Sequence, residues 1–294
     1  GKPQFVYSWK LVPTDRMPAG KREDISLREK ETLIRKNLDD GINTRGGKMT
    51  VCQLYEKTVS QKRNVRHNTQ KGQHYLKTIL EKDPLGGRSI DSVKLSDGKD
   101  WAIRMSEKGY AYRTINNYKR SLKAAFYMAV QDDCIRKNPF DFKLSDVLED
   151  NSGPRTILTP EQEAQMLAFM VMDKTYSKYY DEVVILLETG LRISEFCGLT
   201  MNIDMTNRII NVDHQLMKDT ELGYYIATPK TKNGIRQLPM TERAYRAFQR
   251  ILKNRGRAQP VVIGGYRNFP FLNAKGLPKV AGDYKSMLKG LVKK

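Results

Sequence analysis

The segment DEVVILLETGLRISEFCGLT, residues 181–200, contains an arginine whose setting suits anion chemistry. The pattern predicts a buried helix over Val183 to Leu187, which Gly190 ends, and a second helix capped by Ser194. Arg192 therefore lies in a tight turn between apolar neighbours, where a guanidinium is held toward an anionic group. A structural salt bridge with Glu195 accounts for the same pattern equally well.

Two lysines stand further along, at the tip of a predicted hairpin. The segment 208–240 predicts an antiparallel sheet with strands at Ile209–Asp213, Tyr224–Ala227 and Arg236–Met240. TPKTKNGI joins the last two strands, and its Asn-Gly pair is a tight-turn signal. Taken alone, this tip is best explained as a solvated, lysine-rich turn that exposes Lys230 and Lys232.

Basic and amide side chains form two clusters on predicted helices. The first is at the start of one helix, and the second follows the early turns of another: Arg63, Arg66 and Lys71; Arg113, Asn117, Lys119, Arg120 and Lys123. Such side chains neutralise phosphates or read base edges. For any single residue, a solvated helix face is the better explanation. The two clusters together favour contact with DNA.

The charge of the whole chain supports a polyanionic partner. Its 294 residues include 52 Lys+Arg and 33 Asp+Glu, a net charge of +19 that is spread along the sequence. No apolar run is long enough for a membrane span, and the N-terminus lacks the apolar region of a secretory signal. The isolated Cys52, Cys134 and Cys197 have neither metal-ligand nor disulfide spacing, which indicates a reducing cytoplasm.

The elements that must position these residues fall into several regions. Residues 5–12 predict a strand, and 26–40 a helix with Ser26 as N-cap, Glu29 completing a capping box and Gly41 past its end. The helix has an apolar side formed by Leu27, Leu33, Ile34 and Leu38. One strand and one helix cannot bury a core, so we expect the partner strands of residues 1–42 to lie upstream.

Four helices are predicted between 49 and 140, at 50–62, 68–82, 97–108 and from Thr114 as N-cap to Ala129. Residues 43–48 and 141–158 are predicted as linkers. A second domain, 159–294, begins with Thr159 as N-cap and Pro160 at the first helical position, and has later helices at 241–254 and 283–293. The predicted fold class is mainly α with a small antiparallel β-sheet.

Several sequence segments of the chain resemble those of a known protein family. LLETGLRISEFCGLT, TPKTKNGIRQLPM and FLN are similar to the first half of a tyrosine-recombinase catalytic domain. YSWKLVPTDRMPAG and RTINNYKRSLKAAFY resemble integrases of Gram-positive conjugative transposons. The resemblance covers essentially the whole chain. It implies a partial arm-binding β/α piece, a helical core-binding domain that clamps DNA and a mixed α/β catalytic domain.

The resemblance also implies roles for single residues. Arg192 matches the first catalytic arginine, which binds the scissile phosphate, and Glu195 matches the acidic residue that supports it. Lys232 matches the general acid toward the leaving 5′ oxygen, with Lys230 as the alternative. The implied reaction passes through a covalent phosphotyrosine and needs no metal or other cofactor. The implied partner is double-stranded DNA with core-type and arm-type sites, bound by a homotetramer in the bacterial cytoplasm.

The chain departs from the family pattern in three features. The family needs a His-x-x-Arg motif, a later His or Trp and a tyrosine nucleophile. The histidines are His67, His74 and His214, and Met217 stands three residues after the last. None of the 15 tyrosines matches the nucleophile position. We therefore expect a chain that has lost the C-terminal catalytic part, and that binds DNA without cleaving it.

Two other functions are alternatives to an integrase. A non-catalytic, sequence-specific DNA-binding protein fits the same charge and clusters. An RNA-binding protein is disfavoured, since the sequence has no aromatic RNA-recognition signature, KH loop or zinc knuckle.

Overall fold

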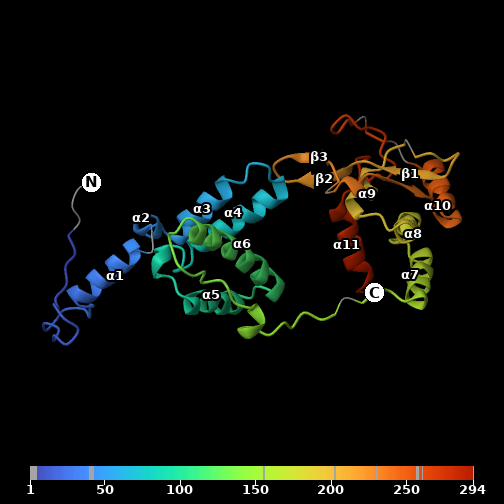
Figure 1. The fold of residues 1–294 in the computed structure, drawn as a ribbon. Helices are drawn as coiled ribbons and strands as arrows, with labels where there is room; N and C mark the ends of the chain where they lie inside the picture. Colours follow the sequence, from blue (N-terminus) through green and yellow to red (C-terminus); the bar gives the residue numbers. More distant parts are fainter. Residues whose placement is uncertain are drawn as a thin grey trace. The chain divides into compact units, whose positions relative to one another are not determined.

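The computed structural model describes residues 5–39, 43–154, 156–201, 203–229, 231–255, 258–259 and 261–293. The chain divides into two compact units, 1–155 and 156–294 (Figure 1). The first unit contains α1 Leu27–Asp39, α2 Thr44–Gly47, α3 Val51–Ser60, α4 His67–Glu81, α5 Leu95–Glu107 and α6 Tyr112–Gln131, with 3-10 helices η1 Ile90–Ser92 and η2 Leu144–Asp146. The second contains η3 Ser177–Tyr179, α7 Pro160–Met172, α8 Tyr180–Thr189, α9 Ile193–Gly198, β1 Ile209–Val212, β2 Gln215–Asp219, β3 Gly223–Ala227, η4 Lys232–Gly234, β4 Arg236–Pro239, α10 Glu242–Lys253 and α11 Ala281–Leu291.

Helices α3 to α6 form a bundle around one apolar core. Their inward positions recur at helical spacing; on α6 they include Ile115, Leu122 and Phe126. Trp101 of α5 is fully buried and meets Phe140 edge-on, with ring centroids 5.7 Å apart. The segment after α6 thus packs into the bundle through Phe140 and then Leu144, because its apolar side chains complete this core. The first part of the predicted 141–158 linker therefore belongs to the bundle.

The helix α6 starts earlier than predicted. Its N-cap is Ala111, whose carbonyl accepts hydrogen bonds from the backbone N–H groups of Thr114 and Ile115 at 2.8 and 3.1 Å. Thr114 therefore lies inside the first turn and is not the cap. Gly109 adopts φ +81° just after the end of α5, so the chain turns there, and residues that can form a helix follow directly. The helix can therefore begin without a side-chain cap.

The N-terminal segment departs from its predicted strand. Residues 5–12 form no strand, because the described residues supply no partner for a hydrogen-bonded ladder. The backbone turns instead, with the N–H groups of Leu11 and Val12 donating to the Asp15 carboxylate at 2.8 and 2.9 Å. The capping box of α1 is confirmed, since Ser26 N–H donates to Glu29 at 2.8 Å. Gly41 lies outside the described residues.

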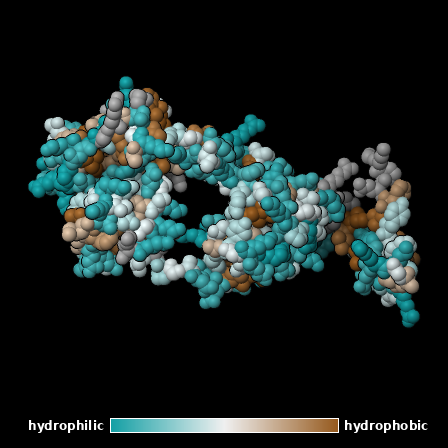
Figure 2. Space-filling model, turned by 180° about the vertical axis from the view of Figure 1, so that it is seen from behind, coloured by the Kyte–Doolittle hydropathy of each residue, from teal (hydrophilic) through white to brown (hydrophobic). Residues whose placement is uncertain are grey.

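The apolar side of α1 is open to solvent. Leu33 and Ile34 are 56% and 40% exposed, and Phe5, Tyr7 and Trp9 on the preceding segment are exposed as well. Figure 2 shows hydrophilic residues over most of the visible surface, with hydrophobic ones gathered in small patches. Among the described residues, no helix is both long and apolar enough to span a bilayer.

The second unit packs α8 against α10 and α9 against β2 (Figure 1). Phe196 of α9 stacks on Phe271 with ring centroids 3.9 Å apart, and Phe248 of α10 lies in the same core. The predicted start of α7 is confirmed, with Thr159 accepting from Gln162 N–H and Pro160 at the first position.

The strands of the second unit pair differently from the prediction. β1 pairs antiparallel with β4, and β2 pairs antiparallel with β3. β2 was not predicted, and it takes the place that the sequence assigned to β4 beside β3. The reason is local: Gly223, at φ +65°, closes a tight β2–β3 hairpin. The lysine-rich segment then forms the 3-10 turn η4, which leads β4 to β1 instead of back along β3.

A buried cluster of three polar side chains joins parts of this unit that are far apart in the sequence. The Lys279 ammonium lies 2.7 and 2.8 Å from the two carboxylate oxygens of Glu182, and the Tyr284 hydroxyl donates to the same carboxylate at 2.8 Å. All three residues are buried. Burial raises the pKa of the Glu182 carboxyl, against the lowering effect of Lys279. This buried triad ties α8 to α11 and to the segment before it.

Candidate active site

Arg192 occupies the N-cap of α9, in the turn that follows Gly190. Gly190 adopts φ +60° at the end of α8, and Leu191 is buried, so the turn is anchored on both sides. The Arg192 Nη1 donates to Glu195 Oε1 at 2.7 Å. The guanidinium side chain is 67% exposed, whereas the Glu195 side chain is fully buried. A salt bridge is therefore present and the guanidinium still faces solvent, and the anion-binding role of Arg192 stays a prediction.

The cap of α9 corrects a prediction. Ser194 was expected to cap this helix, but the cap is Arg192, whose backbone N–H donates to Glu195 Oε2 at 3.1 Å. The Glu195 carboxylate thus does the capping. The Ser194 hydroxyl instead donates to Gln215 on β2 at 3.1 Å.

A second arginine reaches the same carboxylate. Arg236 on β4 donates from Nη2 to Glu195 Oε2 at 2.9 Å and from Nη1 to the Gly234 carbonyl at 3.1 Å. Its side chain is 27% exposed. Burial raises the pKa of the Glu195 carboxyl, but hydrogen bonds from Arg236 and Arg192 outweigh it, so the pKa lies below its ordinary value. Glu195 is therefore a buried carboxylate that stays ionised at neutral pH.

The two lysine candidates are placed only in part. Lys232 begins the turn η4, and Gly234 N–H donates to the Thr231 carbonyl at 2.9 Å to close that turn. The side chain of Lys232 and the whole of Lys230 lie outside the described residues.

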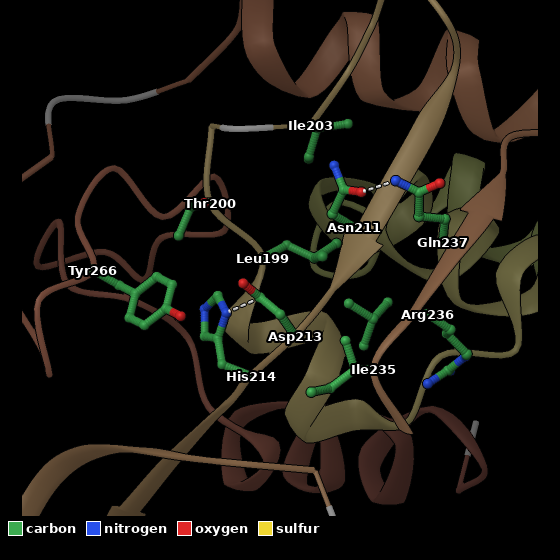
Figure 3. A pocket seen from close by; sticks show the side chains of 11 residues that line it. Leu199, Thr200, Ile203, Asn211, Asp213, His214, Ile235, Arg236, Gln237 and Tyr266 are labelled. Carbon is green, nitrogen blue, oxygen red and sulfur yellow. Dashed lines mark hydrogen bonds and ion pairs between the residues drawn. The ribbon is translucent and has the colours of Figure 1, made fainter. Parts of the chain in front are cut away.

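A cavity of about 570 Å³ opens beside Arg236, between β1, β4 and the loop after α9. Figure 3 shows His214 and Tyr266 on one side of it and Arg236 on the other. The two rings stack with centroids 3.7 Å apart, and His214 Nδ1 lies 2.5 Å from Asp213 Oδ1. His214 is 7% exposed. The sequence predicts no role for His214, because the His-x-x-Arg motif that it would begin is absent.

Arg236 was missed as a site residue, although a signal for it existed. In β4 the half-buried positions alternate with exposed ones, so Arg236 shares the inner face with Leu238. An arginine on the inner face of a strand needs an anionic partner. The wrong strand pairing concealed the fact that this partner is Glu195.

The predicted DNA-binding residues fall into two groups by exposure. Arg113, Asn117 and Arg120 are exposed on α6, and their spacing of four and three residues places them on one helix face. Arg63 and Arg66 are exposed just before α4, and Lys71 on α4 is half-buried. The helices are neighbours, since Tyr75 of α4 and Tyr118 of α6 have ring centroids 6.4 Å apart.

Two lysines of the α6 cluster do not fit a free DNA-contacting face. Lys119 is 5% exposed, with its ammonium 4.5 Å from the centre of the Phe142 ring, and burial lowers its pKa. Lys123 lies 2.5 Å from Asp141 in an ion pair. Both placements have one cause: the segment after α6 folds back over this side of the helix, which buries Lys119 and pairs the half-buried Lys123 with Asp141. Contact of these two lysines with DNA stays a prediction.

Comparison with protein-family models gives three matches in chain order. Residues 1–38 match the DNA binding domain of Tn916 integrase. Residues 50–145 match the phage integrase SAM-like domain, and residues 156–294 match the phage integrase family. The matched ranges follow the same order as the regions predicted from the sequence.

Two curated relatives are similar in sequence to this chain, one over its whole length and one over about half of it. The transposase from transposon Tn916 of Enterococcus faecalis is 64% identical over 295 residues, which covers 100% of this chain and 73% of the relative. The ICEBs1 integrase of Bacillus subtilis (strain 168) is 25% identical over 162 residues, or 55% of this chain and 43% of the relative.

Two solved structures are similar to this chain, one in both sequence and fold and the other in fold alone. The Tn1549 transposon integrase in complex with transposon right end DNA has a TM-score of 0.80 and 59% identity, covering 83% of this chain and 78% of that one. A lambda integrase tetramer bound to a Holliday junction has a TM-score of 0.59 at 12% identity, covering 91% of this chain and 74% of that one, which supports the fold alone.

Proposed function

The chain belongs to the phage integrase family of tyrosine recombinases, as an integrase of the conjugative-transposon type, and on that premise we propose how it acts on DNA. It cuts and rejoins the ends of a mobile element at specific sites. Each strand is cut by attack of a tyrosine hydroxyl on the scissile phosphate. This attack joins the 3′ phosphate to the tyrosine and releases a 5′ hydroxyl. The reverse attack rejoins the strand, so bond energy is conserved and no metal or nucleotide is consumed.

One observation carries this proposal: an exposed guanidinium is fixed on a buried, ionised carboxylate. Glu195 uses both oxygens on protein donors, which holds Arg192 in place from below. The outer side of Arg192 remains open to a phosphate. Arginine suits that task because its planar fork donates two parallel hydrogen bonds and keeps its charge at any relevant pH. We assign Arg192 to the scissile phosphate and Glu195 to its support.

We assign the general acid to Lys232, which protonates the leaving 5′ oxygen, with Lys230 as the alternative. The support is its position: Lys232 starts the turn η4, and the Gly234 carbonyl of the same turn is hydrogen-bonded to Arg236. That bond links the lysine turn to the carboxylate beneath Arg192.

The match of residues 156–294 to the family model gives no support to the expected inactivity of this chain. The chain spans 73% of the curated relative. Trapping of a covalent complex between these 294 residues and cognate duplex tests that expectation directly. An adduct would place the nucleophile within the chain, whereas reversible binding alone would agree with the sequence-based expectation.

The proposed partner is duplex DNA at the ends of the element. Relatives at 58–59% identity have been solved with transposon right end DNA and with circular intermediate DNA. The exposed Arg113, Asn117 and Arg120 give this chain a basic helix face for such a partner. We propose that the protein acts as a homotetramer on paired sites.

The first test is the substitution Arg192→Lys in the natively encoded protein. We expect normal folding and near-normal duplex affinity, with single-turnover cleavage slowed by about 100-fold, because an ammonium cannot reproduce the guanidinium fork on the transition state. The matched control is Arg246→Lys, since Arg246 is exposed and forms an ion pair with Glu242 on its own helix. Parental cleavage by Arg192→Lys removes Arg192 from the active site.

A further inference from the structure

Glu195 is a single buried carboxylate shared by two arginines that differ in exposure. Arg192 holds Oε1 at 2.7 Å, and Arg236 holds Oε2 at 2.9 Å. Arg192 is 67% exposed and Arg236 only 27%. Both terminal nitrogens of Arg236 already donate to protein acceptors, the Gly234 carbonyl and Glu195, whereas the outer side of Arg192 is open. The two arginines therefore have different tasks, and only Arg192 is arranged for an anion from outside.

The second donor of Arg236 makes it more than a counter-ion. Its Nη1 donates to the Gly234 carbonyl at 3.1 Å, in the turn that begins at Lys232. One planar guanidinium thus joins the carboxylate below Arg192 to the backbone of the lysine turn. Because the fork is rigid, a shift of the turn is transmitted to the carboxylate. Without Arg236, the Glu195 Oε2 atom would keep only the Arg192 backbone N–H as a donor among the residues that the structure describes.

We propose that Arg236 is a positioning residue that holds the Arg192–Glu195 pair and the Lys232 turn in one fixed relation. This inference rests on the proposed function, because it takes Arg192 and Lys232 as the groups that meet the DNA. Arg236 itself contacts neither the phosphate nor the leaving oxygen. Its effect is to keep two groups on separate elements, α9 and η4, aligned on the same reacting phosphate.

The test is a double-mutant cycle on cleavage in the natively encoded protein. Single-turnover formation of the covalent complex and duplex affinity are measured separately, on a duplex of the element's own end, for Arg236→Gln, Glu195→Gln and the double variant. We expect Arg236→Gln to slow cleavage by about 10- to 100-fold, because small misplacements of aligned groups are costly. We expect affinity to change by less than about two-fold. In the Glu195→Gln background the same substitution should cost less than about three-fold.

Two further variants keep the result decisive. Arg246→Gln removes an exposed arginine of the same unit and should cleave at the parental rate. Arg236→Lys keeps the charge but cannot span both acceptors, so it should fold and cleave at an intermediate rate. If Arg236→Gln does not fold, Arg236→Lys decides the matter, and a parental rate in that variant overturns the proposal.

Other outcomes separate this inference from the proposed function. Parental cleavage by Arg236→Gln, equal losses in both backgrounds, or a loss of affinity that matches the loss of rate would each overturn the positioning role. If Arg192→Lys, measured beside them, is impaired while Arg236→Gln is not, only the positioning role fails. If Arg192→Lys cleaves at the parental rate, the assignment of the active site itself fails.

Discussion

At the scale of single residues, the site is a pair with opposite exposures. Glu195 is buried and ionised, and Arg192 is fixed by it yet open to solvent. Sequence reasoning found both residues because their spacing on a helix start is local. It could not choose between a salt bridge and an anion site, since the choice depends on Arg236, which lies 41 residues further along.

The lowered pKa of Glu195 predicts how the second unit responds to acid. A carboxyl whose folded pKa is lowered adds stability above its unfolded pKa, about 4.3, and loses it as the pH falls through the folded value. We expect Glu195→Gln to unfold at lower urea than the parent at about pH 6, with a difference that shrinks toward about pH 3. Urea unfolding followed by hydrogen exchange in α9 measures this. A difference that stays constant with pH would show that the carboxylate charge contributes nothing.

At the scale of elements, helix ends were predictable where a capping side chain or a left-handed glycine marks them. Ser26, Thr159 and Gly190 stand where expected, because each acts on its own helix. Strand pairing was not predictable. The Asn-Gly signal near 233 was assigned to a hairpin, while the hairpin formed at Gly223. Both turn signals are local, but the choice between them depends also on the packing of β2 against α9, which the local sequence does not contain.

The exposed face of α6 predicts a change in the salt dependence of DNA binding. Replacing Arg113 and Arg120 together by Ala should weaken duplex affinity, because each phosphate contact releases counterions. The slope of log affinity against log salt should flatten by about two units if each arginine neutralises one phosphate. Fluorescence anisotropy at several salt concentrations measures the slope. Lys119→Ala is no substitute control because Lys119 is buried, so Lys82→Ala, at the exposed C-cap of α4, serves. An unchanged slope for the double variant would place this face in solvent.

The buried triad predicts a strong asymmetry between two substitutions. Lys279→Met leaves the buried Glu182 without its counter-ion, and we expect a loss of about 3–5 kcal/mol in the free energy of unfolding. Combining it with Glu182→Gln should recover much of that loss, because no charge then remains buried. Lys289→Met, on the exposed side of α11, is the control and should change stability by less than about 0.5 kcal/mol. Equal losses in the single and double variants would contradict the charge argument.

At the scale of the whole molecule, two apolar cores divide the chain. The bundle core includes Trp101 and Phe126, and the second core includes Phe196 and Phe248. The helices that carry these residues were predicted from the sequence, at 97–108, from Thr114 to Ala129, at 241–254 and after Ser194. The packing of residues 140–144 against α6 was not predicted, because Pro139 and the acidic residues after it are typical of a linker.

Separate cores predict separate responses to a cavity. Phe126→Ala should destabilise the bundle by about 3–5 kcal/mol while the second unit keeps its stability. Phe248→Ala should do the reverse. Native-state hydrogen exchange, compared between α5 and α8, distinguishes the two units. If either substitution lowers protection equally in both helices, the units unfold as one.

The buried triad also sets the order in which this protein can fold during synthesis. Glu182 emerges from the ribosome 97 residues before its partner Lys279 and 102 residues before Tyr284. The bundle ends near Leu144, so all of its core is made early and can condense while translation continues. The nascent second unit instead carries an unpaired Glu182 until α11 has been made. We therefore expect the bundle to fold first during synthesis, and the unit that holds Arg192 to be completed only after α11 has been made.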